Sequence, residues 1–236
     1  MKTAFEKADG IVVETLIDSA KLQQVLMGMM LSSRKLPELV SEEDFKLIDT
    51  EVQKTLGADL NMLSQFKPVF ITFMLTMTYN QQENSEFLAK YSGTPIDIYF
   101  GSAGKKSGKA VSSFESMEEQ FNILFRHDTE EKQAEQLVEF VKTKEEMRSS
   151  MKELTGLYIH QDLKGMYDMY KKYARQFGSA AYLLEDRNEK WMDVLPSMLK
   201  EGNKFIAVGA LHFTGEKGLI KLLREAGYTV KPIPVK

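Results

Sequence analysis

The chain has 236 residues, enough to bury one substantial hydrophobic core, and a single domain with insertions is the default expectation. Apolar residues make up 43% and charged residues 28%, a composition typical of globular proteins. The 31 basic residues are balanced by 34 acidic ones, so no positive excess can neutralise phosphates and nucleic-acid binding is not expected. The lack of cysteine excludes disulfides, thiolate ligands and a cysteine nucleophile, but leaves the compartment open.

The N-terminus does not have the basic start, apolar run and small residues of a signal peptide. The most apolar stretch, residues 68–78, is about half of the roughly 20 residues that a spanning helix needs, which favours a core helix. We therefore expect a soluble chain without a membrane span. Export to the periplasm or cell surface is expected only if a signal peptide lies upstream.

Four short apolar segments are predicted to be strands. They are residues 11–13, 109–114, 205–208 and 228–233. The first ends in Glu14, the second ends in Glu115, and the third leads into Gly209 and His212. Pro232 in the fourth segment indicates an edge strand, because proline cannot donate a backbone hydrogen bond.

Between these segments the periodicity is helical. Ser41 and Ser116 each begin a capping box, and Gly57 ends the first of the two helices. The charged segment 129–150 is typical of a solvated helix with a narrow apolar stripe, Ala134, Leu137, Val138 and Val141. Further helices are expected at residues 161–177, 189–201 and 216–226.

Short strands that alternate with helices predict an α/β (α+β) fold, with a small central, largely parallel sheet flanked by helices. Residues 17–95 are interpreted as a long helical insertion between two strands of the core. We therefore predict a single domain over residues 1–236.

Glu14, Glu115 and His212 each follow a predicted strand, and each is able to bind a metal. Functional groups gather beyond the carboxyl ends of parallel strands, so the three side chains are expected to share one small volume. Carboxylate and imidazole ligands suit Zn²⁺, Mn²⁺ or Co²⁺ and leave room for a water. The structural alternative is that Glu14 and Glu115 cap the helices that follow them.

His212 is the strongest candidate of three histidines, because Gly209 permits a tight turn that aims the imidazole out of the strand end. His127 lies in a charged turn, and His160 is expected to be a partly buried structural histidine.

Arg187 is the remaining candidate. A guanidinium near two carboxylates can orient them, or stabilise an oxyanion during acyl transfer. The structural alternative is that Asp186 or Asn188 caps the helix carrying Trp191, and that Arg187 makes a surface ion pair.

Four segments, in the same order along the chain, resemble the TraB/GumN family, whose relatives include the Tiki metalloproteases. Residues 205–230 resemble its C-terminal signature of a strand, Gly-x-x-His, a Gly-rich turn, a helix and Gly-Tyr-x-Val. Residues 186–191 fit its Arg-Asn element, residues 97–120 its Gly-Lys element with a Glu after a strand, and residues 4–14 its strand ending in Glu.

The resemblance implies a compact α/β core related to the erythromycin-esterase and haem-uptake ChaN-like folds, and divalent-metal-dependent proteolysis as in the Tiki members. It also implies two Gly-x-x-His motifs at strand ends. Carried over by position, His212 is the second motif's histidine, Glu14 and Glu115 are the acidic groups, and Arg187 is the site arginine. His212 with Glu14 would hold the metal, Mn, Co or Zn.

The family's first Gly-x-x-His should precede residue 4 by about one strand and a turn, and the sequence does not contain it. Two functions are weighed. One is a metal-dependent, peptidase-like hydrolase with a peptide or protein substrate. The other is a non-catalytic, peptide-binding or regulatory protein on the same scaffold, as in the inhibition of peptide pheromone signalling, which the missing motif favours.

Two further expectations concern surfaces. Six methionines in the helical insertion suggest an adaptable apolar surface that could capture a ligand, but a plain core role is the favoured interpretation: Met27, Met29, Met30, Met62, Met74 and Met77. A sheet that lacks one strand exposes an edge, so pairing between copies into a homo-oligomer is expected.

Overall fold

The computed structural model describes residues 1–90, 93–177 and 180–233. The chain forms two compact units. The first, here called the sheet unit, consists of Met1–Asp18, Gly93–Gln120 and His160–Lys236. The second, here called the helical unit, consists of Ser19–Ser92 and Phe121–Ile159. The helical unit takes in most of the predicted insertion, residues 17–95, and also residues 121–159. The single domain over residues 1–236 with one insertion stays a prediction.

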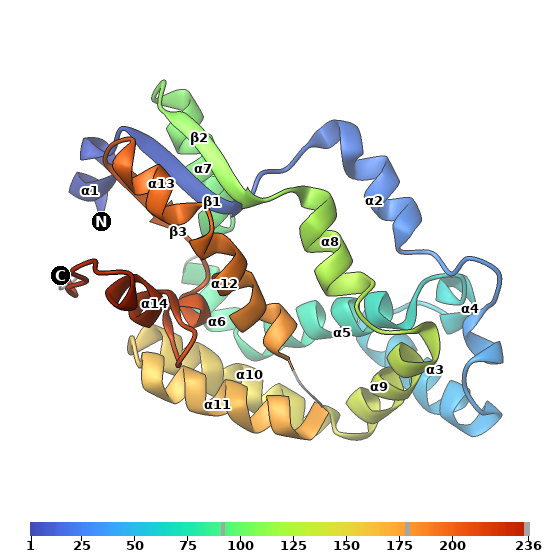
Figure 1. The fold of residues 1–236 in the computed structure, drawn as a ribbon. Coiled ribbons are helices and arrows are strands. Elements are labelled where there is room, and N and C mark those ends of the chain that lie inside the picture. The colour runs from blue at the N-terminus through green and yellow to red at the C-terminus, as the bar shows by residue number, and fades with distance from the viewer. Residues whose placement is uncertain (91–92, 178–179, 234–236) are drawn as a thin grey trace. The chain divides into compact units, whose positions relative to one another are not determined.

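The sheet unit is built on three parallel strands in the order β2-β1-β3 (Figure 1). They are β1 (Gly10–Thr15), β2 (Ala110–Glu115) and β3 (Lys204–Ala207). Thr15 pairs with Glu115 and Val13 with Ala207, so the carboxyl ends of all three strands lie at the same edge. The predicted α/β class, a small parallel sheet flanked by helices in a mostly helical chain, is confirmed.

Helices cover both faces of this sheet. On one face, α7 packs on Ile11 and Val13 through Phe100. On the other face, the fully buried Trp191 packs with Leu219 of α14. The helices of the sheet unit are α1 (Lys2–Lys7), α7 (Ile96–Lys106), α11 (Leu163–Phe177), α12 (Glu185–Met192), α13 (Leu195–Lys200) and α14 (Leu219–Glu225), with 3₁₀ turns η3 (Ala181–Leu183) and η4 (Ala210–Phe213). Helix α8 (Met117–Phe125) begins in this unit, and the Ser116–Glu119 capping box closes its first turn at 2.9 and 3.2 Å.

Two predicted elements of the sheet unit are wrong. Residues 228–233 form no strand, because they have no buried face and Arg224, not a neighbouring strand, donates to the Val230 carbonyl. The single helix predicted at 189–201 is two helices, since Pro196 begins α13 in its first turn and cannot continue the hydrogen bonding of α12.

The helical unit packs around one apolar core formed mainly by α3, α5 and α9. The predicted cap and stop of α3 are confirmed: Ser41 accepts from the Asp44 amide, and Gly57 takes φ 67°. The elements are η1 (Ser19–Lys21), α2 (Leu22–Gly28), η2 (Leu36–Glu38), α3 (Glu42–Leu56), α4 (Leu60–Leu63), α5 (Pro68–Glu83), α6 (Ser85–Lys90), α9 (Glu130–Lys142) and α10 (Lys144–Ile159).

The apolar segment 68–78 lies within α5, where Ile71 and Leu75 are fully buried in this core, as predicted. Within the described ranges, no helix combines the length and the apolar character that crossing a membrane requires.

Candidate functional site

Arg187 is the centre of a buried polar cluster in the sheet unit. A guanidinium has five N–H donors, and all five are used here. Nε donates to Oε1 of Glu115 at 2.8 Å, and Nη2 donates to Oε2 of Glu115 at 3.0 Å and to Oε2 of Glu14 at 2.7 Å. Nη1 donates to the Leu183 carbonyl at 3.1 Å and lies 3.2 Å from Nε2 of His212. The guanidinium therefore joins both acidic residues to the histidine.

Trp191 completes the surroundings of Glu115. Its indole Nε1 donates to Oε1 of Glu115 at 2.8 Å, the oxygen that also accepts from Arg187. Arg187 and Trp191 are four residues apart in α12, so both side chains lie on the helix face that meets the strand ends. Cζ of Arg187 lies 5.0 Å from the centroid of the indole ring, and the centroid of the His212 ring lies 4.3 Å from it. Glu115, only 2% exposed, thus accepts three hydrogen bonds in a nearly dry environment.

Asn188 fixes the protonation of His212. Its Nδ2 donates to the backbone carbonyls of His212 at 3.1 Å and Lys217 at 2.8 Å, and two carbonyls can be matched only by the NH₂ end of the amide. Oδ1 of Asn188 therefore faces Nδ1 of His212, at 2.7 Å, and must accept a hydrogen bond from it. The imidazole consequently carries its hydrogen on Nδ1, and Nε2 keeps a lone pair that faces Arg187.

The cluster holds His212 neutral. Burial, and then the positive charge of Arg187, lower the pKa of His212 to about 3, against an ordinary value of 6.5. Burial acts to lower the pKa of Arg187 as well, but its hydrogen bonds and charge interactions with Glu115 and Glu14 outweigh burial and raise that pKa. At neutral pH the imidazole of His212 is thus uncharged, beside the charged guanidinium of Arg187.

Glu14 is the member of the cluster nearest to solvent. Its side chain is 15% exposed, against 3% for His212 and 8% for Arg187. Oε1 of Glu14 accepts from the Gly209 amide at 2.6 Å and lies 3.8 Å from Nε2 of His212. A Cβ at Gly209 would lie 3.2 Å from Oε1 of Glu14, so the glycine permits this close approach.

The structure brings all four predicted site residues together at the carboxyl edge of the sheet. The alternatives in which Glu115 caps a helix and Arg187 makes a surface pair are wrong, because both side chains are buried against each other. His160 is exposed, not partly buried as predicted, and lies in a turn before α11. The catalytic and metal-binding roles assigned from the sequence stay predictions.

The donor set fits a divalent ion only in part. Two ligands of one tetrahedral zinc lie about 3.4 Å apart, close to the 3.8 Å between Oε1 of Glu14 and Nε2 of His212. Both oxygens of Glu115, however, already accept from Arg187. Among the described residues, no group of three or more histidine, aspartate or glutamate side chains is arranged to hold a metal ion. Glu14 and His212 therefore make up a two-ligand site, one short of the usual three protein ligands of catalytic zinc.

Sequence reasoning did not assign site roles to Asn188 and Trp191. The signal was available: Trp191 is the single tryptophan, placed one helical turn after Arg187, and Asn188 follows Arg187 directly. Their hydrogen-bond partners come from strand β2 and from the segment after β3, so the roles depend on the tertiary fold.

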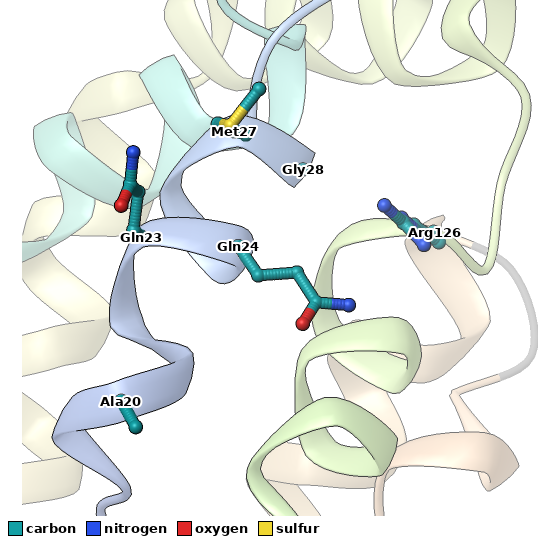
Figure 2. A pocket seen from close by; sticks show the side chains of 6 residues that line it. All are labelled: Ala20, Gln23, Gln24, Met27, Gly28 and Arg126. Atoms are coloured by element: carbon teal, nitrogen blue, oxygen red, sulfur yellow. The ribbon is translucent and has the colours of Figure 1, made fainter.

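The helical unit has a separate, open pocket of about 460 Å³ beside α2 (Figure 2). Gln24 points from α2 across this pocket, and Arg126 lies on its opposite side. Of the six methionines only Met27 lines it. The favoured core interpretation is wrong for four of the six, which are exposed, whereas Met29 and Met74 are partly buried: Met27, Met30, Met62 and Met77. The lining combines amide, guanidinium and thioether groups, and capture of a ligand by the methionines stays a prediction.

The fold and the site together define an α/β protein with a neutral histidine, two glutamates and an arginine hydrogen-bonded across the carboxyl ends of parallel strands. The TraB/PrgY/gumN family model matches residues 1–232, and the chain belongs to this family. No curated protein and no solved structure matches the chain.

Proposed function

We propose that this chain is a metal-dependent hydrolase that acts on a peptide or protein substrate. His212 and Glu14 are the proposed ligands of Mn²⁺, Co²⁺ or Zn²⁺, and Glu14, Glu115 and Arg187 are the proposed catalytic groups. The observation that carries the proposal is the 3.8 Å gap between Oε1 of Glu14 and the unprotonated Nε2 of His212, at the most exposed side of the cluster.

Energetic considerations support a functional role for the cluster. Moving two carboxylates and a guanidinium out of water costs several kcal/mol per ion, and apolar residues of similar volume often give equal or greater stability. A neutral imidazole with a free ring nitrogen is the protonation state that metal binding requires. Burial of the acidic residues, the arginine and the histidine at one strand edge is therefore better explained by chemistry than by stability.

The protein groups divide the work according to their contacts. A divalent ion held by His212 and Glu14 would supply a bound water with a lowered pKa. Glu14 is the better-placed proton acceptor, because Glu115 is 2% exposed and already accepts three hydrogen bonds. Glu115 holds the guanidinium of Arg187 in place. Arg187 in turn provides positive charge where an oxyanion forms during acyl transfer.

A non-catalytic binding or regulatory function is the second candidate. Two observations favour it. Among the described residues only Glu14 and His212 are placed as metal ligands, and all five N–H donors of Arg187 already bind groups of the protein. In this case the cluster would fix the strand ends, and a peptide would be bound without being cleaved.

Calorimetric titration with Mn²⁺, Co²⁺ and Zn²⁺ separates the two functions. We expect saturable binding of one ion per chain, lost in His212→Ala and Glu14→Gln and kept in His127→Ala, whose histidine is exposed and outside the site. Hydrolysis of a peptide library should then require the ion and stop on chelation. If none of the three ions binds, the metal-dependent hydrolase is rejected in favour of the binding protein.

Self-association is a further part of the proposal. In the described sheet, β2 and β3 are edge strands with one unpaired side each, and such edges favour pairing between copies. Light scattering after size exclusion should give the mass of a dimer or larger assembly; the mass of one chain at all concentrations would contradict this.

A further inference from the structure

His212 can hold only one cation at a time. Its Nδ1 carries the hydrogen and donates it in a hydrogen bond to Oδ1 of Asn188, so Nε2 is the only ring nitrogen with a lone pair. That single lone pair faces the Arg187 Nη1 donor at 3.2 Å. An N–H donor and a metal ion cannot share it, so binding of a metal at His212 requires Arg187 to leave.

The second proposed ligand is in the same situation. Oε2 of Glu14 accepts from Nη2 of Arg187 at 2.7 Å, which brings the guanidinium charge against the carboxylate that would bind the ion. A divalent ion between Glu14 and His212 would lie within a few ångströms of this charge, and like charges at such a distance in a poorly solvated site repel strongly. Geometry and charge therefore both exclude the two cations from occupying the site together.

We propose that the Arg187 guanidinium is the resident cation of this site and that a divalent ion binds by displacing it from His212 and Glu14. The inference rests on the proposed metal-dependent function. It assigns to Arg187 a second role, that of an internal competitor which keeps the site closed until the ion arrives.

The exchange has a defined anchor. Of the five hydrogen bonds of Arg187, only those to His212 and Glu14 involve the proposed metal ligands. Glu115, held also by Trp191, remains as the carboxylate partner of the displaced guanidinium.

The sign of an affinity change tests this inference. If Arg187 competes, Arg187→Ala must bind Mn²⁺ more tightly than the unmodified chain, by about tenfold or more, because a charge that opposes the ion is gone. If Arg187 only orients the ligands, the same variant must bind more weakly. Calorimetry gives the dissociation constant directly, without any assay of activity.

Two further variants guard against loss of folding. Arg187→Lys keeps a cation for Glu115, but an ammonium cannot reproduce the planar guanidinium that reaches Glu115, Glu14 and His212 together. It should therefore also bind Mn²⁺ more tightly than the unmodified chain. Lys217→Ala removes an exposed positive charge that pairs with Glu189, and its affinity should stay within about twofold of the unmodified chain.

The outcomes distinguish this inference from the proposed function. Tighter binding in both Arg187 variants, lost again in the Arg187→Ala, His212→Ala double variant, supports the exchange. Equal or weaker binding in both variants, with binding retained by the unmodified chain, overturns the exchange and leaves the hydrolase proposal standing. Absence of binding in every variant overturns the proposed metal function itself.

Discussion

Asn188 holds His212 at two points, accepting from the ring at Nδ1 at 2.7 Å and donating to the backbone carbonyl at 3.1 Å. Because the same amide also donates to the Lys217 carbonyl, its orientation is fixed, and with it the tautomer of His212. The side chain and the backbone of the histidine are thus positioned by one neighbour that is 1% exposed.

This relationship predicts the nitrogen-15 spectrum of His212. In the folded chain Nδ1 should be protonated and Nε2 unprotonated, and NMR shifts of the two ring nitrogens measure this directly. Asn188→Ala should abolish the preference and destabilise the fold by about 2–4 kcal/mol, because buried hydrogen-bonding groups lose their partner. The exposed Asn61→Ala is the matched control, with a change of about 0.5 kcal/mol or less. An Nε2-protonated ring in the unmodified chain would contradict the assignment.

Removal of Glu115 should be the most damaging single change in the cluster. Glu115→Ala leaves Arg187 buried with only Glu14 as a charged partner, and breaking a buried ion pair in this way costs about 3–5 kcal/mol. Urea unfolding followed by circular dichroism measures the loss. Glu201→Ala, at a side chain 69% exposed, should change the unfolding free energy by less than about 0.5 kcal/mol. Equal effects of the two substitutions would show that the cluster does not support the fold.

The neutral state of His212 predicts a pH dependence of stability. The pKa of His212 is about 3 in the folded chain and near 6.5 when unfolded, so between these values the unfolded chain binds a proton that the folded chain does not. The contribution of His212 to the free energy of unfolding is therefore fully present above pH 6.5. It is lost as the pH falls toward 3, at up to about 1.4 kcal/mol per pH unit. Unfolding measured from pH 7 to pH 4 should therefore decline more steeply in the unmodified chain than in His212→Gln. Parallel curves would show that His212 titrates normally.

Helix α7 packs closely on the sheet through a glycine. A Cβ at Gly104 would lie 2.7 Å from Cγ1 of Ile11 and 2.9 Å from Cγ2 of Val111, so Gly104→Ala should cost about 1–3 kcal/mol. Gly156 in α10 has open space around it, and Gly156→Ala should stabilise by up to about 1 kcal/mol through helix propensity. Thermal unfolding should show a lower melting temperature for Gly104→Ala and a higher one for Gly156→Ala. An unchanged melting temperature in Gly104→Ala would disprove the close packing.

The convergence of Glu14, Glu115 and His212 could be predicted from the sequence because it depends on two local signals. Short β-branched runs followed by helices indicate parallel strands, and parallel strands end at one edge. Each candidate stands at or just after such a run. That the three side chains lie near one another at this edge then follows from the strand topology.

Other features could not be predicted, because they depend on tertiary packing. Residues 228–233 follow a glycine and include apolar side chains, a pattern typical of a strand. In the structure, however, this segment has no buried face and no strand partner. The central place of Arg187 depends on its contacts with Glu115, which lies 72 residues away from Arg187 and 76 residues away from Trp191, its two partners in α12. The spacing of sequence motifs does not tell which hydrogen-bond donor contacts which acceptor atom.

The most direct test of the central claim is the anomalous scattering of crystals of this chain grown with Mn²⁺ or Co²⁺. We predict one strong peak in contact with Nε2 of His212 and a carboxylate oxygen of Glu14, with Arg187 moved away from the imidazole. Crystals saturated with either ion in which Arg187 still contacts Nε2 of His212, and which have no peak at Glu14, would contradict it.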